Sequence, residues 1–271
     1  MKYLRTTLTL VAATLFLAAC ASGPGKSGAT APTDIRAKAE KKKTTVRAAT
    51  KPVQRKARRT VSCKVRENVV AWVLVRGGCK NGYAYGRGEA RSVDGTRHYR
   101  GQFIDGRFSG KGSYDWGDGT RYTGQFRRGK KQGTGTVLYA DGSKYSGGFR
   151  DNLYDGRGTF TGADKSRYTG EFRNGQYNGA GRFAWPNGNR YRGEFRNNVM
   201  AGRGSFTRAN GERYEGQFAD NEMSGKGVYT WPNGERYEGH FADNEMNGRG
   251  TYYYTDGTSY TGEFRDGKRV E

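Results

Sequence analysis

Residues 168–190 read YTGEFRNGQYNGAGRFAWPNGNR, and this stretch is one period of the repeat that decides the fold. Its opening motif, Tyr-x-Gly-x-Phe, returns at intervals of 23 residues. The motif starts at Tyr99, Tyr122, Tyr145, Tyr168, Tyr191, Tyr214, Tyr237 and Tyr260. Self-similarity at one fixed period is the signature of a repeat architecture in which each unit packs on its neighbours.

Each period predicts a β-hairpin. In residues 122–144 the Tyr, Gly and Phe of the motif alternate with polar residues, so they share one face of a strand. A loop follows, and a second strand is expected to begin at Gly133. Asp141-Gly142 then predicts a tight type I′ turn into the next period. Because Asp164-Lys165 lacks the glycine of this pair, we expect only that turn to be irregular.

Stacked side by side, these hairpins predict an all-β fold: an elongated single-layer antiparallel sheet of about 17 strands. The aromatic residues gather on one face, and a single layer provides no second sheet to cover them. We therefore predict that this face binds a partner, while the alternative is that the rings pack on one another as a core. The candidate binding residues are Tyr122, Phe126, Tyr168, Phe172, Phe183, Trp185, Tyr191, Phe195, Phe206, Tyr214, Tyr229 and Trp231.

Tyr-x-Gly-x-Phe followed by Gly-x-Gly and Asp-Gly resembles the MORN (membrane occupation and recognition nexus) family, which is built of 23-residue hairpins. The resemblance covers residues 78–271. It implies a scaffold: some members are proposed to bind acidic phospholipids and some to self-associate. MORN segments also precede catalytic domains in lipid kinases and lysine methyltransferases, but no such domain is recognisable in this sequence.

The N-terminus predicts export to a bacterial cell envelope. Lys2 and Arg5 precede an apolar run, residues 8–19, that is too short to span a bilayer comfortably. Leu17-Ala18-Ala19-Cys20 resembles the lipobox of bacterial lipoproteins, which implies a signal peptide over residues 1–19 and lipid attachment at Cys20. A plain secretory signal is the alternative. Ala21 stands where an aspartate would mark inner-membrane retention, which favours a periplasm-facing protein of the outer membrane.

Residues 20–60 predict a disordered basic tether. They show no hydrophobic periodicity and hold twelve basic residues against two acidic ones, Asp34 and Glu40. Beside a lipid anchor, such a segment would bind anionic headgroups or peptidoglycan carboxylates. The alternative is a solvated spacer.

Residues 61–98 predict a degenerate capping unit before the array of residues 99–271. Cys63 and Cys79 lie within it, and in an exported protein this pair predicts a disulfide. The alternative is two free thiols. Closing a loop of this length would stabilise the cap by about 3 kcal/mol.

The sequence predicts no enzyme, no metal site and no cofactor. His98 and His240 are the only histidines, and neither has a neighbouring nucleophile and acid. Glutamates recur at one position of the repeat and form a column on the polar face. They support only a remote alternative, a periplasmic hydrolase, because a catalytic site needs different residue types brought together and this column repeats one type. Its members are Glu171, Glu194, Glu215, Glu238 and Glu263.

The formal net charge of +22 predicts an anionic partner. Because the protein is expected to be exported, we do not expect nucleic acid to be this partner. We therefore predict a lipid-anchored, non-catalytic scaffold whose array binds a protein, lipid headgroups or an anionic envelope polymer. A self-associating structural protein, a homo-oligomer, is the alternative.

Overall fold

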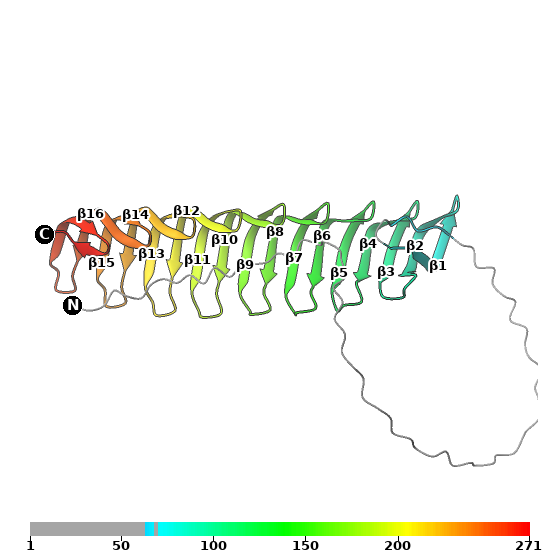
Figure 1. Cartoon of the computed structure of the whole chain (residues 1–271), viewed down its shortest axis with the longest axis horizontal. Coiled ribbons are helices and arrows are strands. Elements are labelled where there is room, and N and C mark those ends of the chain that lie inside the picture. The colour runs from blue at the N-terminus through cyan, green and yellow to red at the C-terminus, as the bar shows by residue number, and fades with distance from the viewer. Residues whose placement is uncertain (1–62, 68–69) are drawn as a thin grey trace, which may run out of the picture. The chain divides into compact units, whose positions relative to one another are not determined.

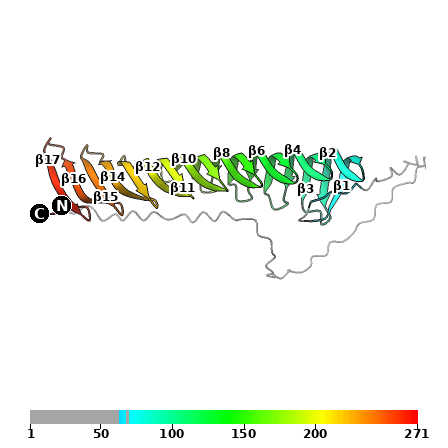
Figure 2. The ribbon, with the colours of Figure 1, turned by 90° about the horizontal axis from the view of Figure 1, so that it is seen from above.

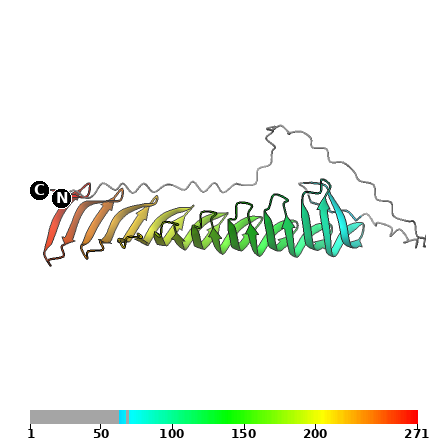
Figure 3. The ribbon, with the colours of Figure 1, turned by 90° about the horizontal axis from the view of Figure 1, so that it is seen from below.

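The computed structural model describes residues 63–67 and 70–271, which form one antiparallel sheet of 18 strands without a helix (Figure 1). Each strand pairs with its neighbours in sequence, from the first pair of strands to the last. Figures 2 and 3 show these strands as one ribbon seen from opposite sides. The predicted all-β, single-layer architecture is confirmed.

The strands alternate between shorter and longer members. They are β1 (Trp72–Lys80), β2 (Tyr83–Ser92), β3 (His98–Ile104), β4 (Arg107–Asp115), β5 (Arg121–Arg127), β6 (Lys130–Leu138), β7 (Lys144–Arg150), β8 (Leu153–Thr161), β9 (Arg167–Arg173), β10 (Gln176–Ala184), β11 (Arg190–Arg196), β12 (Val199–Thr207), β13 (Arg213–Ala219), β14 (Glu222–Thr230), β15 (Arg236–Ala242), β16 (Glu245–Tyr253), β17 (Ser259–Arg265) and β18 (Lys268–Arg269).

The tight type I′ turns lie at the opposite end of the hairpins from the one predicted. In the β11–β12 turn, Asn197 and Asn198 both have positive φ, 49° and 73°, as a type I′ turn requires. The Asp-Gly segments instead form longer loops in which only the glycine is left-handed. Gly142, for example, has φ 83° and donates its N–H to Tyr139 O at 3.0 Å. The second strand therefore starts before Gly133, at Lys130.

The expectation of one irregular turn at Asp164-Lys165 is also wrong. Lys165 adopts φ 72° and donates its N–H to Gly162 O at 3.0 Å, as Gly142 does at the equivalent position. The surrounding hairpin imposes the left-handed conformation on a residue that disfavours it. The loop that departs from the common form contains Gly117, which has φ 81° in addition to the left-handed Gly119.

A register shift recurs at the Gly-x-Gly segment within the hairpins. Between β11 and β12, Gly193 pairs with Gly204 but Glu194 pairs with Ala201, so Gly202 and Arg203 bulge out of the ladder. A bulge bends its strand and increases the local twist. Repeated along the ribbon, these bends curve the sheet across its width (Figure 1).

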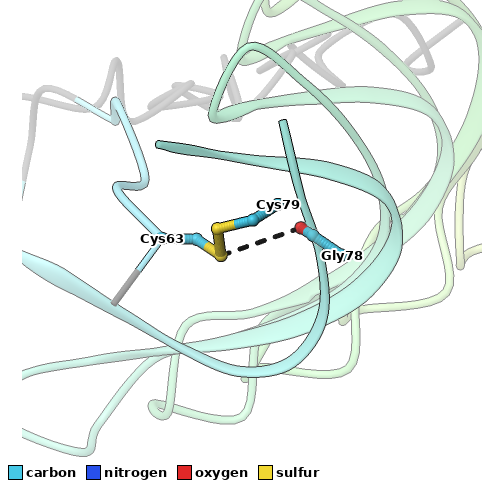
Figure 4. Close-up of a disulfide and its surroundings, with 3 residues drawn as sticks. All are labelled: Cys63, Gly78 and Cys79. Carbon is cyan, nitrogen blue, oxygen red and sulfur yellow. Dashed lines mark hydrogen bonds between the residues drawn. A yellow bond between two sulfur atoms is a disulfide. The ribbon is translucent and has the colours of Figure 1, made fainter. Parts of the chain in front are cut away.

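The N-terminal segment, Cys63–Glu67, crosses the turn ends of the first hairpins. Lys64 donates its N–H to Gly82 O at 2.9 Å, and Arg66 donates to Gly106 O at 2.7 Å. Glu67 Oε1 accepts the N–H of Phe108 at 2.9 Å. The predicted disulfide, Cys63–Cys79, joins this segment to the end of β1 with the two Cα atoms 5.7 Å apart (Figure 4).

Candidate functional site

Nine of the twelve aromatic residues predicted to bind a partner are buried. Tyr168 is 0 % exposed, and the ring of Tyr177 stacks on it with centroids 3.8 Å apart, while Phe172 and Phe195 contact it edge-on at 5.1 Å. Phe195 belongs to the next repeat, so these contacts also couple neighbouring repeats. The nine buried residues are Tyr122, Phe126, Tyr168, Phe172, Phe183, Tyr191, Phe195, Phe206 and Tyr214.

For these nine residues the idea of an uncovered aromatic face is corrected. The described residues contain no second layer, but the curved sheet and the mutual stacking of the rings exclude water from them. They form the core, as the alternative interpretation held. The remaining three, Trp185, Tyr229 and Trp231, are partly buried and pack against that core, so a partner could reach only part of each ring.

The glycines of the repeat are required because each tyrosine ring lies over them. A methyl group at Gly181 would lie 2.6 Å from Cε2 of Tyr168, which is too close. The hydroxyl of Tyr168 donates a hydrogen bond to Glu171 O at 2.9 Å, satisfying its buried polar group. Burial raises the pKa of Tyr168 above the ordinary value of a phenol.

The opposite, polar face carries an open trough of about 1820 Å³ that extends from β9 to β16 along the glycine row. Its lining contains eight cationic and three acidic side chains. These are Arg167, Arg182, Arg190, Arg192, Arg203, Arg213, Lys226 and Arg249, with Glu194, Glu215 and Glu238. We call this surface the cationic trough.

The repeat positions these cations in register. Arg167, Arg190 and Arg213 each precede the tyrosine of their period, as does Arg236 outside the lining, so these arginines point to the face opposite the tyrosines. Ala184, Thr207 and Thr230 lie between them on the intervening strands. Equivalent arginines therefore stand two strands apart, about 9.6 Å.

Charge compensation divides the cationic trough into two halves. Over β13–β16, Glu215 pairs with Arg213, and Glu238 lies 3.8 Å from Arg236. Over β9–β12, the only lining carboxylate is that of Glu194, which accepts the backbone N–H of Arg203 at 3.3 Å. The β9–β12 half is therefore the more cationic one.

Both histidines lie within contact distance of another polar group. His98 contacts Glu89 at 2.7 Å, and His240 Nδ1 lies 3.2 Å from Arg249 O. Three of the five glutamates of the column are engaged as just described: Glu194, Glu215 and Glu238. Over the described residues, no three His, Cys, Asp or Glu side chains cluster as metal ligands.

The sequence interpretation missed the cationic trough, although a signal was present. The residues that alternate with the aromatic ones include arginines at fixed repeat positions, and this alternation places them on one face. Twelve of the basic residues lie in residues 20–60, so the net charge alone does not point to this face.

A family model described as MORN repeat matches the chain in eight consecutive segments: residues 99–121, 122–144, 145–167, 168–190, 191–213, 214–236, 237–259 and 260–270. The chain belongs to the MORN-repeat family. The cationic trough therefore lies wholly on MORN repeats. No curated protein matches the chain in a sequence search.

The solved structures that are similar to this chain include three TCP domains. The wild-type TCP10 domain of Danio rerio CPAP is 12% identical, covering 74% of this chain and 94% of that one with a TM-score of 0.40. The same domain in complex with a STIL peptide is 14% identical, with 70% and 83% coverage and a TM-score of 0.41. The SAS-4 TCP domain of Drosophila melanogaster, in complex with a proline-rich motif of Ana2, is 13% identical, with 58% and 85% coverage and a TM-score of 0.37.

The predicted signal peptide, Cys20 and the tether of residues 20–60 lie outside the described residues. Within residues 63–67 and 70–271, no helix is long and apolar enough to cross a bilayer.

Proposed function

We propose that this protein is a non-catalytic binding scaffold whose MORN array receives an anionic partner in the cationic trough. The observation that carries the proposal is the set of uncompensated arginines over β9–β12. A repeat array presents the same groups many times along one rigid surface, which suits recognition of an extended partner. Catalysis needs unlike groups that converge, whereas the glutamates of the column recur as like groups at the repeat spacing.

The dimensions of the trough favour an extended chain as the partner. Eight neighbouring strands span about 34 Å across the sheet. The sequence predicts a protein, lipid headgroups or an anionic envelope polymer as the partner. Of these, an acidic protein segment or an anionic envelope polymer is long enough to lie along the whole trough. Lipid headgroups would instead be the natural partners of the basic tether, residues 20–60.

We also propose that the protein is a lipoprotein anchored through Cys20 in the bacterial cell envelope, facing the periplasm, as expected from the sequence. The lipobox-like residues Leu17-Ala18-Ala19-Cys20 support this location. Anchoring would hold the array at one membrane, and the outer membrane is favoured by Ala21.

Crosslinking and affinity capture from intact cells test this function. We would compare the native chain, a chain truncated after Thr60, and the double variant Arg167→Ser/Arg190→Ser. Serine occupies the equivalent position at Ser259, so the array tolerates it. The matched control is Arg173→Ala/Arg196→Ala, which removes the same charge outside the trough at positions where other repeats have Ala219 and Ala242.

Partners that are captured by the native chain and the control, but lost with the truncation and the serine variant, would support the proposal. Retention of the same partners by the truncated chain would assign binding to residues 21–60 and reject the trough. A plain secretory signal would be revealed by a mature protein without acyl chains on Cys20.

Self-association is a second candidate, and one observation favours it. Among residues 63–67 and 70–271, strand β1 pairs only with β2, so its other edge has no partner strand there, and Val73 and Val75 on β1 are 54% and 56% exposed. An open edge with apolar side chains can pair with another chain. Light scattering would show a dimer that Val75→Lys returns to a monomer if this edge mediates assembly.

A further inference from the structure

One cross-strand pair in the cationic trough departs from the pattern of the array. Arg182 on β10 stands directly opposite Arg192 on β11. At the equivalent place, Thr159 and Thr169 share a hydroxyl hydrogen bond of 3.1 Å, and Thr251 and Thr261 share one of 2.9 Å. At the equivalent place between β2 and β3, the two opposed residues, Glu89 and Arg100, carry opposite charges.

This arginine pair has no compensation within the described residues. Neither guanidinium has a carboxylate oxygen within 4 Å or a hydrogen bond to another group. Both side chains are exposed in the trough. Cβ atoms of directly opposed residues are about 5 Å apart, and like charges at that separation destabilise a sheet.

The neighbours of the pair add hydrogen-bond donors and further charge. Across the sheet, Thr169 lies next to Arg182 and Ser205 next to Arg192. Arg190 and Arg203 line the same part of the trough. An anion seated between the two guanidiniums would meet donors on several sides.

We propose that Arg182 and Arg192 form a binding site for a phosphoryl group of a soluble, non-lipid ligand. A phosphate monoester carries a charge of about −1.5 to −2 and three acceptor oxygens, so one group neutralises both arginines. A carboxylate carries one charge and would leave the second arginine uncompensated. A flat anionic bilayer laid on this face would also meet Glu215 and Glu238, whereas a local phosphoryl group would not.

The inference rests on the proposed function, because it places a specific ligand group in the cationic trough. The test is calorimetric titration of the full-length chain with pyrophosphate at constant ionic strength. The key variant is Arg182→Thr/Arg192→Thr, which installs the hydroxyl pair that the array already uses at Thr159 and Thr169. The control is again Arg173→Ala/Arg196→Ala.

We expect the threonine variant to lose affinity for pyrophosphate by about tenfold or more and the control by less than about twofold. The threonine variant should also melt at a higher temperature than the native chain, because a repulsion is removed; this shows that it folds. Equal losses in both variants, or no binding by the native chain, would overturn the proposal.

Two further titrations separate phosphoryl recognition from other anion binding. Succinate should bind more weakly than pyrophosphate, and equal affinity would overturn the assignment to a phosphoryl group. Vesicles of phosphatidylglycerol should bind the native chain and the threonine variant alike. Vesicle binding that depends on Arg182 and Arg192, without pyrophosphate binding, would reject the soluble ligand. If pyrophosphate fails while capture in cells still depends on Arg167 and Arg190, only this inference fails and the scaffold function stands.

Discussion

At the scale of the residue, the buried tyrosine hydroxyls differ in whether they have a hydrogen-bond partner. Tyr168 donates its hydroxyl hydrogen to Glu171 O, whereas the hydroxyl of Tyr177 is buried without a hydrogen-bond partner. In the preceding repeat the equivalent Tyr154 contacts the hydroxyl of Tyr139, but Gly162 occupies the corresponding place beside Tyr177. Within the described part of the chain, the core therefore contains one buried side-chain polar atom without a partner, which the sequence pattern does not reveal.

We predict that Tyr177→Phe raises the free energy of unfolding by about 1 kcal/mol, because it removes a buried, unsatisfied hydroxyl. Tyr168→Phe should lower the free energy of unfolding by about 1 kcal/mol, because it removes a hydroxyl that is hydrogen-bonded. Denaturant titrations of the two variants measure the difference. A loss of stability in both would mean that Tyr177 has a partner, such as an ordered water.

Lys165 carries the second residue-scale prediction. Its φ of 72° is left-handed, which costs a non-glycine residue about 1 kcal/mol. Lys165→Gly should therefore raise the thermal midpoint, and Lys144→Gly, at the first residue of β7, should lower it. An unchanged or lower midpoint for Lys165→Gly would mean that the greater freedom of glycine in the unfolded chain offsets the relief of strain.

At the scale of the element, the segment Cys63–Glu67 completes the hydrogen bonding of the first repeats. In later repeats an asparagine at the type I′ turn accepts a backbone N–H of the preceding repeat: Asn198 accepts from Tyr177 and Asn221 from Met200, both at 2.8 Å. Gly129 occupies the equivalent turn position in the first repeats but has no side chain to accept the N–H of Phe108. The carboxylate of Glu67 accepts this N–H instead. The disulfide holds this segment against the sheet.

We expect Cys63→Ser/Cys79→Ser to destabilise the cap by about 3 kcal/mol through the loss of a cross-link between residues 16 apart. Because repeats couple mainly to their neighbours, the loss should be local. Hydrogen exchange should become faster in β1 and β2 and stay unchanged in β9–β12. Faster exchange along the whole array would show that the cap nucleates the entire sheet.

At the scale of the whole molecule, the row of buried tyrosines makes the array sensitive to alkali. Burial raises the pKa of Tyr122 and of Tyr214 to about 12 and also raises the pKa of Tyr191. An exposed tyrosine has a pKa of about 10. The neutral phenols therefore contribute stability that is fully present below about pH 10 and is lost as the pH rises toward about 12.

The predicted outcome is a denaturation midpoint that is constant up to about pH 9 and falls steeply above about pH 10. Circular dichroism follows the sheet, and the phenolate absorbance follows the tyrosines. Unfolding should coincide with the ionisation of the buried tyrosines. Ionisation of all tyrosines near pH 10 with the sheet intact would contradict their burial.

The sequence by itself determined the local features of this protein. The 23-residue period, the alternation of Tyr, Gly and Phe, and the spacing of Cys63 and Cys79 lead to hairpins, to one antiparallel sheet and to a disulfide, because strand pairing between neighbours depends on local pattern. Alternation also assigned the aromatic and polar residues to opposite faces.

Only the tertiary structure decided which face is enclosed and which is accessible. The alternation of residues along a strand assigns them to two faces but does not say which face is enclosed. Bulges at positions such as Gly202 bend the strands, and the aromatic rings lie on the enclosed face. Turn geometry was also decided by the sheet, since the hairpin forces Lys165 into the conformation of a glycine. The juxtaposition of Arg182 and Arg192 depends on the register across two strands, and a shift of one residue would separate them to opposite faces.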